Sequence, residues 1–300
     1  MEKLWDFRMT DNQRGALLMM ASMAAFTIND TFVKLLGSIM PLGQILFVRG
    51  GFVLIALVAL AWRMGALRWS HSVKDWSLII SRGVAEAAAA FFFLEALIHM
   101  PLANVTALLQ LLPLTVALGG AVFLAEPIGW RRVSAILVGF VGMLLIVRPD
   151  GDGFGTYTIY ALIAVVAVTF RDLAIRRMSK TVPSLLVTLI GAVCVWVFSW
   201  FMMLNTTLVP MGPHEWALIL GAVVFVCFGY VFSVLVMRVG DLSVVALFRY
   251  SGLIWALIMG YLVFGDWPKT LTLIGALLIV GSGLYTMMRE HWHNRRSKSV

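Results

Sequence analysis

The sequence predicts an all-α integral membrane protein with ten transmembrane helices, arranged as two inverted five-helix repeats. Three observations support this fold class: an apolar composition, ten apolar runs, and a polar pattern in the first run that recurs about 140 positions later. Hydrophobic residues make up 61% of the 300-residue chain and charged residues 13%, with a mean hydropathy of +0.94. These values are far from those of soluble proteins. A run of about 20 apolar residues matches the hydrocarbon thickness of a bilayer.

Short polar breaks separate the apolar runs and so define the predicted spans. The spans are residues 15–36, 43–62, 76–99, 103–124, 130–147, 157–178, 184–204, 216–238, 242–264 and 269–288. No connection is long enough to fold as a separate domain, so function must come from the helices or their ends.

The distribution of lysine and arginine predicts that both termini are cytoplasmic. With the N-terminus inside, the external segments hold only Arg148 and Lys269. The cytoplasmic segments hold sixteen basic residues, namely Lys3, Arg8, Arg14, Arg63, Arg68, Lys74, Arg131, Arg132, Arg176, Arg177, Lys180, Arg238, Arg289, Arg295, Arg296 and Lys298. This asymmetry predicts a multi-pass protein of a bacterial-type inner membrane. The scattered charges form no groove for nucleic acid.

The first span contains Thr27–Lys34, and a shift of 142 positions places Thr169–Arg176 on it with threonine, aspartate and a basic residue in common. An acidic residue also closes both the fourth and the ninth span, Glu126 and Asp266. These coincidences favour an internal duplication. Because five helices per repeat is an odd number, the second repeat enters the membrane with opposite polarity, an arrangement common in secondary transporters.

The duplication predicts five segments along the chain. They are a cytoplasmic segment 1–14, a first repeat 15–147, an external linker 148–156, a second repeat 157–288, and a basic cytoplasmic tail 289–300 that meets anionic lipid.

Polar residues inside the spans are the candidates for substrate binding or coupling. A charged group in hydrocarbon is unfavourable by at least about 2.5 kcal/mol, so it tends to be paired or to line water. The candidates are Asn29, Asp30, Lys34, Arg49, Arg82, Glu86, Glu95, Gln110, Arg171, Asp172, Arg249 and Tyr250.

Three pairs of these charges have the four-residue spacing of intrahelical ion pairs. The pairs are Asp30 with Lys34, Arg82 with Glu86, and Asp172 with Arg176. Mutual neutralisation for folding and a direct role in transport are equally compatible with this spacing.

Arg49 and Arg249 have no partner at helical spacing in their own spans. We expect them to contact a carboxylate on another helix or an anionic group of a substrate. Glu86 and Glu95 are nine residues apart and face different directions, and Glu86 is the one expected to face a cavity.

Within the spans, five basic residues stand against four acidic ones, which favours a zwitterion or an organic anion over a simple cation. Protons are a candidate coupling ion, because buried carboxylates form proton relays in transporters. The carboxylates concerned are Asp30, Glu86, Glu95 and Asp172.

Pro113 in the fourth span and Gly252 in the ninth are expected to act in gating, because proline removes a helical hydrogen bond and kinks the helix. The sequence predicts no cofactor and no metal site. The acidic turn 150–153 lacks the ligand spacing of a calcium loop, and Cys194 and Cys227 have no metal-ligand spacing.

Six stretches of the sequence form a pattern that is shared with a known family: Met100–Ala107, Leu112–Leu114, Leu124–Arg132 and Gly139–Gly142, together with Asp30–Lys34 and Phe47–Gly50. They resemble the EamA-type transporters of the drug/metabolite transporter superfamily. The resemblance implies ten helices, two inverted EamA repeats, and alternating access without ATP hydrolysis. The pattern looks closest to the branch of S-adenosylmethionine and riboflavin transporters, alongside amino-acid and metabolite exporters. It departs in the second repeat, where Leu253 replaces the proline.

The sequence therefore predicts a secondary active transporter, not an enzyme. Its expected substrate is a small polar or amphipathic metabolite: amino-acid-like, S-adenosylmethionine-like, riboflavin-like or an organic anion. The alternatives are a channel, which would show a filter motif or a ring of charge, and a polytopic membrane enzyme, which would need clustered nucleophiles or metal ligands.

Overall fold

The structure is a computed structural model. It describes residues 10–63, 65, 70, 72–125, 129–147, 155–179, 181–204, 206–236 and 245–297. Within these ranges the chain is helical and contains no strand. Eight helical stretches are long and apolar enough to cross a membrane, and two shorter apolar helices cover residues 133–147 and 270–286. The predicted all-α, multi-pass class is confirmed.

Each predicted span corresponds to a helix or to a broken pair of helices. The first five are α1 (Asp11–Gly37), α2 (Leu42–Arg63), α3 (Val73–His99), α4 (Leu102–Leu109) with α5 (Leu112–Leu124), and α6 (Trp130–Val147). The last five are α7 (Thr156–Arg177), α8 (Ser184–Met203), α9 (Pro213–Val236), the 3₁₀ helix η1 (Ala246–Tyr250) with α11 (Ser251–Phe264), and α12 (Thr270–Ser297).

The structure corrects three of the predicted spans, since the ninth is divided into η1 and α11. The fourth is not one continuous helix, because α4 ends at Leu109 and α5 begins at Leu112, with Pro113 in its first turn. Proline has no amide hydrogen, so Pro113 cannot donate to the carbonyl of Leu109, and α4 does not continue through this point. The tenth helix continues to Ser297, beyond the predicted end at 288.

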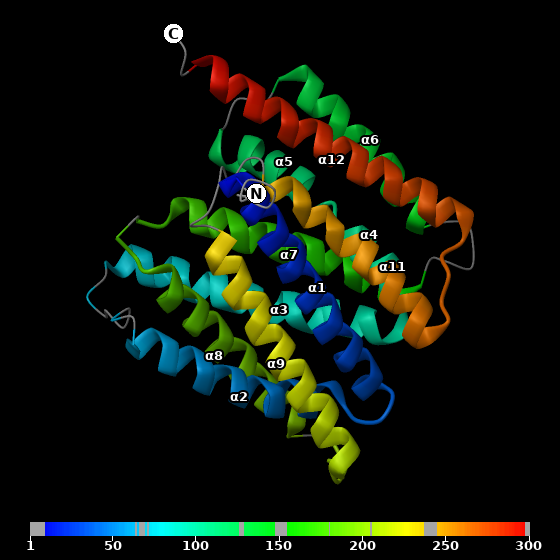
Figure 1. The fold of residues 1–300 in the computed structure, drawn as a ribbon. Coiled ribbons are helices and arrows are strands. Elements are labelled where there is room, and N and C mark those ends of the chain that lie inside the picture. Colours follow the sequence, from blue (N-terminus) through cyan, green and yellow to red (C-terminus); the bar gives the residue numbers. More distant parts are fainter. Residues whose placement is uncertain are drawn as a thin grey trace, which may run out of the picture.

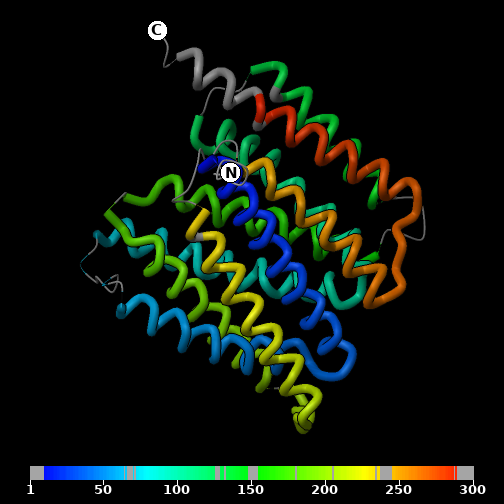
Figure 2. The backbone as a smooth tube through the Cα atoms, in the orientation of Figure 1, coloured from blue at the N-terminus to red at the C-terminus, as the bar shows by residue number. Residues whose placement is uncertain are grey.

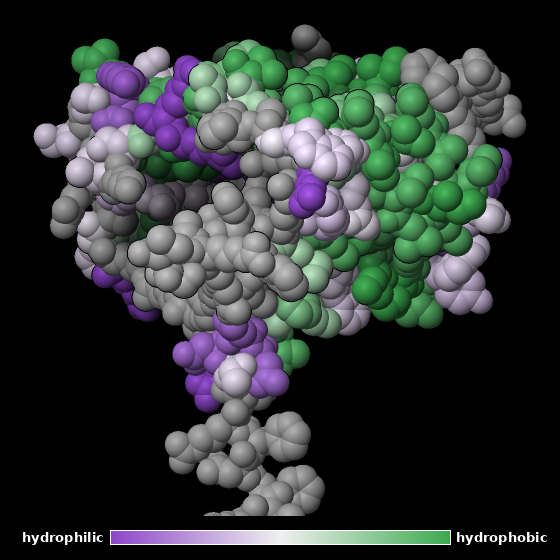
Figure 3. All heavy atoms as spheres, turned by 90° about the horizontal axis from the view of Figure 1, so that it is seen from above, coloured by the Kyte–Doolittle hydropathy of each residue, from purple (hydrophilic) through white to green (hydrophobic). Residues whose placement is uncertain are grey.

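The outward surface of the bundle is apolar. Side chains such as Ile55, Val122 and Leu277 are 66–71% exposed, and Figure 3 shows broad hydrophobic areas on the face viewed. A soluble monomer rarely exposes so much contiguous apolar surface, whereas contact with lipid tails favours it.

The main helix contacts join an element from the first half of the chain to one from the second half. The pairs are α1 with α9, α3 with α7, α2 with α8, α6 with α12, and α4 with α11. In Figure 1 the α6–α12 pair forms one edge of the bundle and α2 lies at the opposite edge. Figure 2 shows α1 and α9 running side by side across the front.

Small residues allow close approach at these contacts, as is typical of helix packing in membranes. On α9, Gly221 and Gly229 leave room for the rings of Phe32 and Phe26 from α1. The Ser22 hydroxyl of α1 donates a hydrogen bond of 2.9 Å to the Gly229 carbonyl. The two halves are thus held together by contacts deep inside the bundle.

The α6–α12 contact is a direct approach of two backbones. A Cβ atom built on Gly142 would lie 2.6 Å from the carbonyl oxygen of Gly275, and one built on Gly275 would lie 2.5 Å from that of Gly142. Neither backbone can move aside without separating the helices, so only glycine fits at both positions.

Candidate functional site

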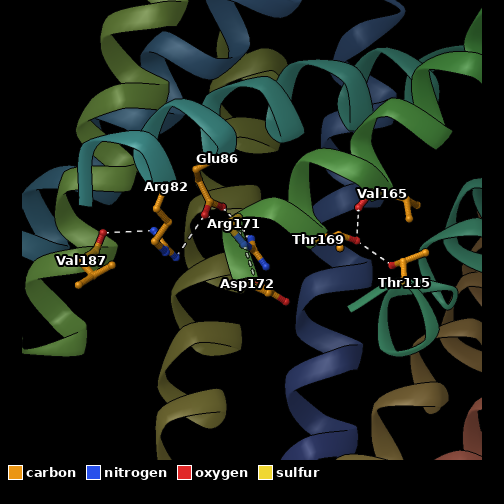
Figure 4. A network of polar contacts seen from close by, with 8 residues as sticks. All are labelled: Arg82, Glu86, Thr115, Val165, Thr169, Arg171, Asp172 and Val187. Carbon is orange, nitrogen blue, oxygen red and sulfur yellow. Dashed lines mark hydrogen bonds and ion pairs between the residues drawn. The ribbon is translucent and has the colours of Figure 1, made fainter. Parts of the chain in front are cut away.

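Four of the predicted site residues form one charged network between α3 and α7 (Figure 4). Glu86 Oε2 lies 3.3 Å from Arg82 Nη2, which confirms the predicted ion pair at four-residue spacing. Arg171 Nη1 lies 3.1 Å from Glu86 Oε1, and its Nε donates to Asp172 Oδ1 at 3.0 Å. The side chains keep 10–26% exposure, so the network is largely shielded from solvent.

A third helix, α8, provides a backbone carbonyl that accepts a hydrogen bond from Arg82 and leaves room for the Arg82 side chain. Arg82 Nη1 donates to the Val187 carbonyl oxygen at 3.2 Å. A Cβ on Gly191 would lie 2.8 Å from the same nitrogen, so the absence of a side chain there makes room for the guanidinium. Arg82 is only 8% exposed, and these contacts fix its position beside Glu86.

A pair of threonines holds α7 to α5 about half a turn before Arg171. The hydroxyl oxygens of Thr115 and Thr169 lie 2.7 Å apart, and Thr169 also donates to the Val165 carbonyl at 2.7 Å. Thr115 lies just after the break between α4 and α5. The broken helix is thereby connected to the helix that carries Arg171 and Asp172 (Figure 4).

Lys34 does not pair with Asp30, and this predicted ion pair is wrong. Its ammonium group donates to the carbonyl oxygens of Leu97, Ile98 and Met100 at 2.8, 3.2 and 2.7 Å. The last carbonyls of a helix have no intrahelical donor and carry the negative end of its dipole. The C-terminal end of α3 therefore offers Lys34 more acceptors than a single carboxylate does.

Replacing Lys34 with methionine is expected to lower the free energy of unfolding by about 2 kcal/mol, because three charge-assisted hydrogen bonds are lost and the carbonyls stay shielded. Thermal unfolding of the purified protein in detergent measures the change. The control is Lys269→Met, at an exposed lysine just before α12. Equal stability of the two variants would contradict the capping role.

Asp30 interacts with Asn29 on its own helix and with Arg49 of α2. Asn29 Nδ2 donates to Asp30 Oδ1 at 2.9 Å, and Arg49 is the charged group that interacts with Asp30 electrostatically. The Nε of Arg49 and the Oδ1 of Asn29 are buried without a hydrogen-bond partner. Asp30 is thus the carboxylate of another helix with which Arg49 interacts electrostatically, while a direct contact of Arg49 with a carboxylate or a substrate stays a prediction.

Sequence reasoning missed Tyr230 on α9. Its side chain is 37% exposed, yet protein atoms surround its hydroxyl, which interacts electrostatically with Glu86, Arg49 and Arg171. Tyr230 therefore carries a hydroxyl group on α9 that interacts with charged side chains of α2, α3 and α7. A tyrosine deep in an apolar run looks like a packing residue, and only its tertiary neighbours reveal its position.

The two helix breaks lie against each other. Gln110, the C-cap residue of α4, is buried. Its amide nitrogen is 3.6 Å from where a Cβ on Gly252 would lie, at the start of α11. The ring of Tyr250 packs against Gly283 of α12, and its hydroxyl is buried without a partner among the described residues.

Glu95 lies apart from the network. Its Oε2 is 3.7 Å from Nδ1 of His99 on the same helix, and the His99 ring stacks on Tyr157 of α7 with centroids 3.9 Å apart. Glu86 and Glu95 thus have different partners, in line with the different directions predicted from their spacing.

A helical bundle with a mixed charge network at the contact between its halves defines a polytopic membrane protein of the transporter class. Residues 13–148 match the EamA-like transporter family. This is the family that the sequence was found to resemble.

Curated relatives extend the similarity over most of the chain. The pseudopaline exporter of Pseudomonas aeruginosa is 27% identical over 269 residues, which cover 89% of this chain and 93% of the relative. The riboflavin transporter of Vibrio cholerae is 25% identical, covering 96% and 97%. The S-adenosylmethionine uptake transporter of Rickettsia felis is 24% identical, covering 90% of each chain. These relatives are named as transporters and not as enzymes, as the sequence predicted.

A solved crystal structure has the same fold. It superimposes with a TM-score of 0.62 over 92% of this chain and 98% of its own, at 18% identity.

Proposed function

We propose that the protein is a secondary active transporter that moves a small polar or amphipathic metabolite across the inner membrane by alternating access. The observation that carries the proposal is the network of Arg82, Glu86, Arg171 and Asp172. These charges lie inside membrane-spanning helices, stay partly accessible, and connect one half of the chain to the other. Charges in such a position typically mark a substrate or ion pathway.

The proposal includes two inverted five-helix repeats, 15–147 and 157–288, joined by the linker 148–156. Ala125 and Gly265, 140 positions apart, both end a helix in left-handed conformation, with φ of 53° and 68°. The helix breaks after Gln110 and Tyr250 have the same separation. The helix contacts also fit two equivalent repeats. In this arrangement α1 and α7 are the first helices of the repeats, and α3 and α9 are the third. The contact of α1 with α9 therefore corresponds to the contact of α7 with α3.

We further propose that both termini are cytoplasmic and that the structure represents the shape open to the cytoplasm. Figure 3 shows a hollow bordered by hydrophilic residues toward the end of the molecule where α3 begins and α7 ends. At the opposite end, Lys34 ties α1 to the last carbonyls of α3. In alternating access, each state is open at one end and closed at the other. A hollow at one end and the Lys34 contacts at the opposite end fit such a state.

Counterflow in proteoliposomes tests the proposal. Labelled riboflavin and S-adenosylmethionine, which relatives are named for, and a panel of amino acids are the first probes. Saturable exchange of a probe against its unlabelled form is expected for a carrier. Conductance that does not saturate would indicate a channel, and chemical conversion of a probe would indicate an enzyme. A proton gradient imposed across the same vesicles tests coupling through Asp30, Glu86, Glu95 and Asp172.

Asp30 and Asp172 occupy equivalent positions in the two proposed repeats. Asp30 lies in the outer half of the membrane and Asp172 in the inner half, so Asp30→Asn and Asp172→Asn are expected to bias opposite faces of the transport cycle. Labelling of single cysteines by a membrane-impermeant thiol reagent, from each side in turn, measures the bias. If both variants change accessibility equally from both sides, their assignment as opposed gate positions is wrong.

A further inference from the structure

A groove of about 270 Å³ lies between the first turns of α6 and the middle of α12. Its lining combines an arginine, hydroxyl groups and aromatic rings, namely Arg131, Ser134, Ser282, Trp130 and Tyr285. The two helices form one edge of the bundle (Figure 1), and both aromatic side chains are exposed. The groove therefore opens on the outer surface of the bundle, where lipid surrounds the protein.

Trp130 and Tyr285 place the groove at the level of the lipid headgroups. Each ring joins a wide apolar surface to one polar group, so tryptophan and tyrosine concentrate at the boundary between hydrocarbon and water. Trp130 is the first residue of α6. In the proposed orientation this end of α6 is cytoplasmic, and the groove meets the cytoplasmic leaflet.

Arg131 gives the groove a positive charge at this level. Its guanidinium carbon lies 5.3 Å from the centre of the Trp130 ring. Stacking on a ring uses the face of the guanidinium and leaves its in-plane N–H groups able to donate. Among the described residues that line the groove, none is acidic. The groove thus offers donors and a charge that suit an anionic group.

Apolar side chains continue from the groove toward the membrane interior. Val138 lines the groove, and Val141 of α6 and Leu277 of α12 are exposed beyond it. No atom lies within 4 Å of a Cβ built on Gly281, so the missing side chain leaves space beside Tyr285. A molecule with an anionic head and a long apolar chain fits both parts of this surface.

A second groove, on α2, differs in its lining. It has a volume of about 430 Å³ and is lined by Trp62 and by aliphatic side chains such as Leu54 and Val58. Arg63 follows Trp62 in the sequence but does not line this groove. The α2 groove therefore offers contact with acyl chains, whereas the α6–α12 groove also offers groups for a headgroup.

We propose that the α6–α12 groove binds an anionic phospholipid such as phosphatidylglycerol, with its phosphate on Arg131 and an acyl chain along Val138 and Leu277. A guanidinium and a phosphate form charge-assisted hydrogen bonds. A zwitterionic phospholipid carries its own cation beside the phosphate, which offsets the attraction to arginine. The site is separate from the α3–α7 charge network, so the inference goes beyond the proposed transport function, and only the choice of leaflet depends on the proposed orientation.

Competition between two lipids tests the site without transport. The full-length protein in detergent is given phosphatidylglycerol and phosphatidylcholine with identical acyl chains, and bound lipid is measured by native mass spectrometry. Arg131→Gln is expected to lower the affinity for phosphatidylglycerol about fivefold, as for loss of one basic residue beside an anionic lipid, and to leave phosphatidylcholine unchanged. Unchanged affinity for phosphatidylglycerol, or an equal loss for both lipids, overturns the proposal.

Arg63→Gln is the matched control, because it removes the same charge after a tryptophan, beside the groove without polar lining. It should bind phosphatidylglycerol as the wild type does. Ser134→Leu keeps Arg131 but fills part of the groove, so it should weaken binding of phosphatidylglycerol. Equal losses in Arg131→Gln and Arg63→Gln would show a general attraction of basic residues to anionic lipid and would refute the specific site.

The same spectra distinguish a lipid from a second copy of the chain in the groove. A lipid site predicts that Arg131→Gln and Ser134→Leu leave the oligomeric state of the protein unchanged. A shift from dimer to monomer in both variants, with wild-type affinity for phosphatidylglycerol, would assign the groove to a contact between copies and contradict the lipid assignment.

Discussion

Replacing Glu86 with glutamine is expected to lower the free energy of unfolding by about 3 kcal/mol, since breaking a buried ion pair on one side leaves its partner uncompensated. Here one substitution leaves two arginines without their shared carboxylate, because Arg82 and Arg171 both pair with Glu86. The 25% exposure of the Glu86 side chain keeps the expected loss at the lower end of the range for buried pairs. Thermal or denaturant unfolding in detergent measures the loss.

Glu95→Gln is the matched control, because it makes the same change on the same helix. Its partner is the half-exposed His99 at 3.7 Å, so its loss should stay below about 1 kcal/mol. The double variant Glu86→Gln, Arg171→Gln should recover part of the stability lost by Glu86→Gln alone, because one of the two unpaired arginines is then absent. Strictly additive losses in this cycle would show that Glu86 and Arg171 are not coupled.

Gly142→Leu is expected to destabilise the α6–α12 contact by about 3 kcal/mol, the upper end of the range for overpacked cores. Its Cβ would lie 2.6 Å from the Gly275 carbonyl oxygen and 3.0 Å from side-chain atoms of Ile279 and Leu278. A backbone oxygen cannot rotate away as a flexible side chain can, so the two helices must separate. Unfolding temperature and resistance to proteolysis report the effect.

Gly281→Leu on α12 is the control for this substitution, since no atom lies within 4 Å of a Cβ built there. The same change should therefore alter stability by less than about 1 kcal/mol. A similar loss at both positions would mean that leucine is poorly tolerated on these helices in general, and the close backbone approach would then not be the cause.

The positions of the helices could be predicted from the sequence because the relevant signal is local. An apolar run of the right length must form its backbone hydrogen bonds internally, so run and helix coincide. The break beside Pro113 follows from the same local chemistry. The corresponding break at Tyr250 has no proline beside it, so the same local signal is absent there.

The contacts of the site could not be predicted in the same way, because their partners lie far apart in the chain. The four-residue spacing identified Arg82 with Glu86 correctly. It could not show that Arg171, 85 residues away, shares the same carboxylate. For Lys34 the same spacing rule failed, because its ammonium group donates to three carbonyl oxygens at the end of α3 and not to the carboxylate of Asp30.

The hydrogen bonds of Lys34 also make the contact between α1 and α3 independent of the charge of Asp30. Since its ammonium group is held by backbone carbonyls, whose charge never changes, a proton arriving at or leaving Asp30 breaks none of these hydrogen bonds. Had Lys34 paired with Asp30, both partners would lie on α1, and the ammonium group would not connect α1 to α3. The contact between α1 and the C-terminal end of α3 is therefore independent of the charge of the nearest carboxylate on α1.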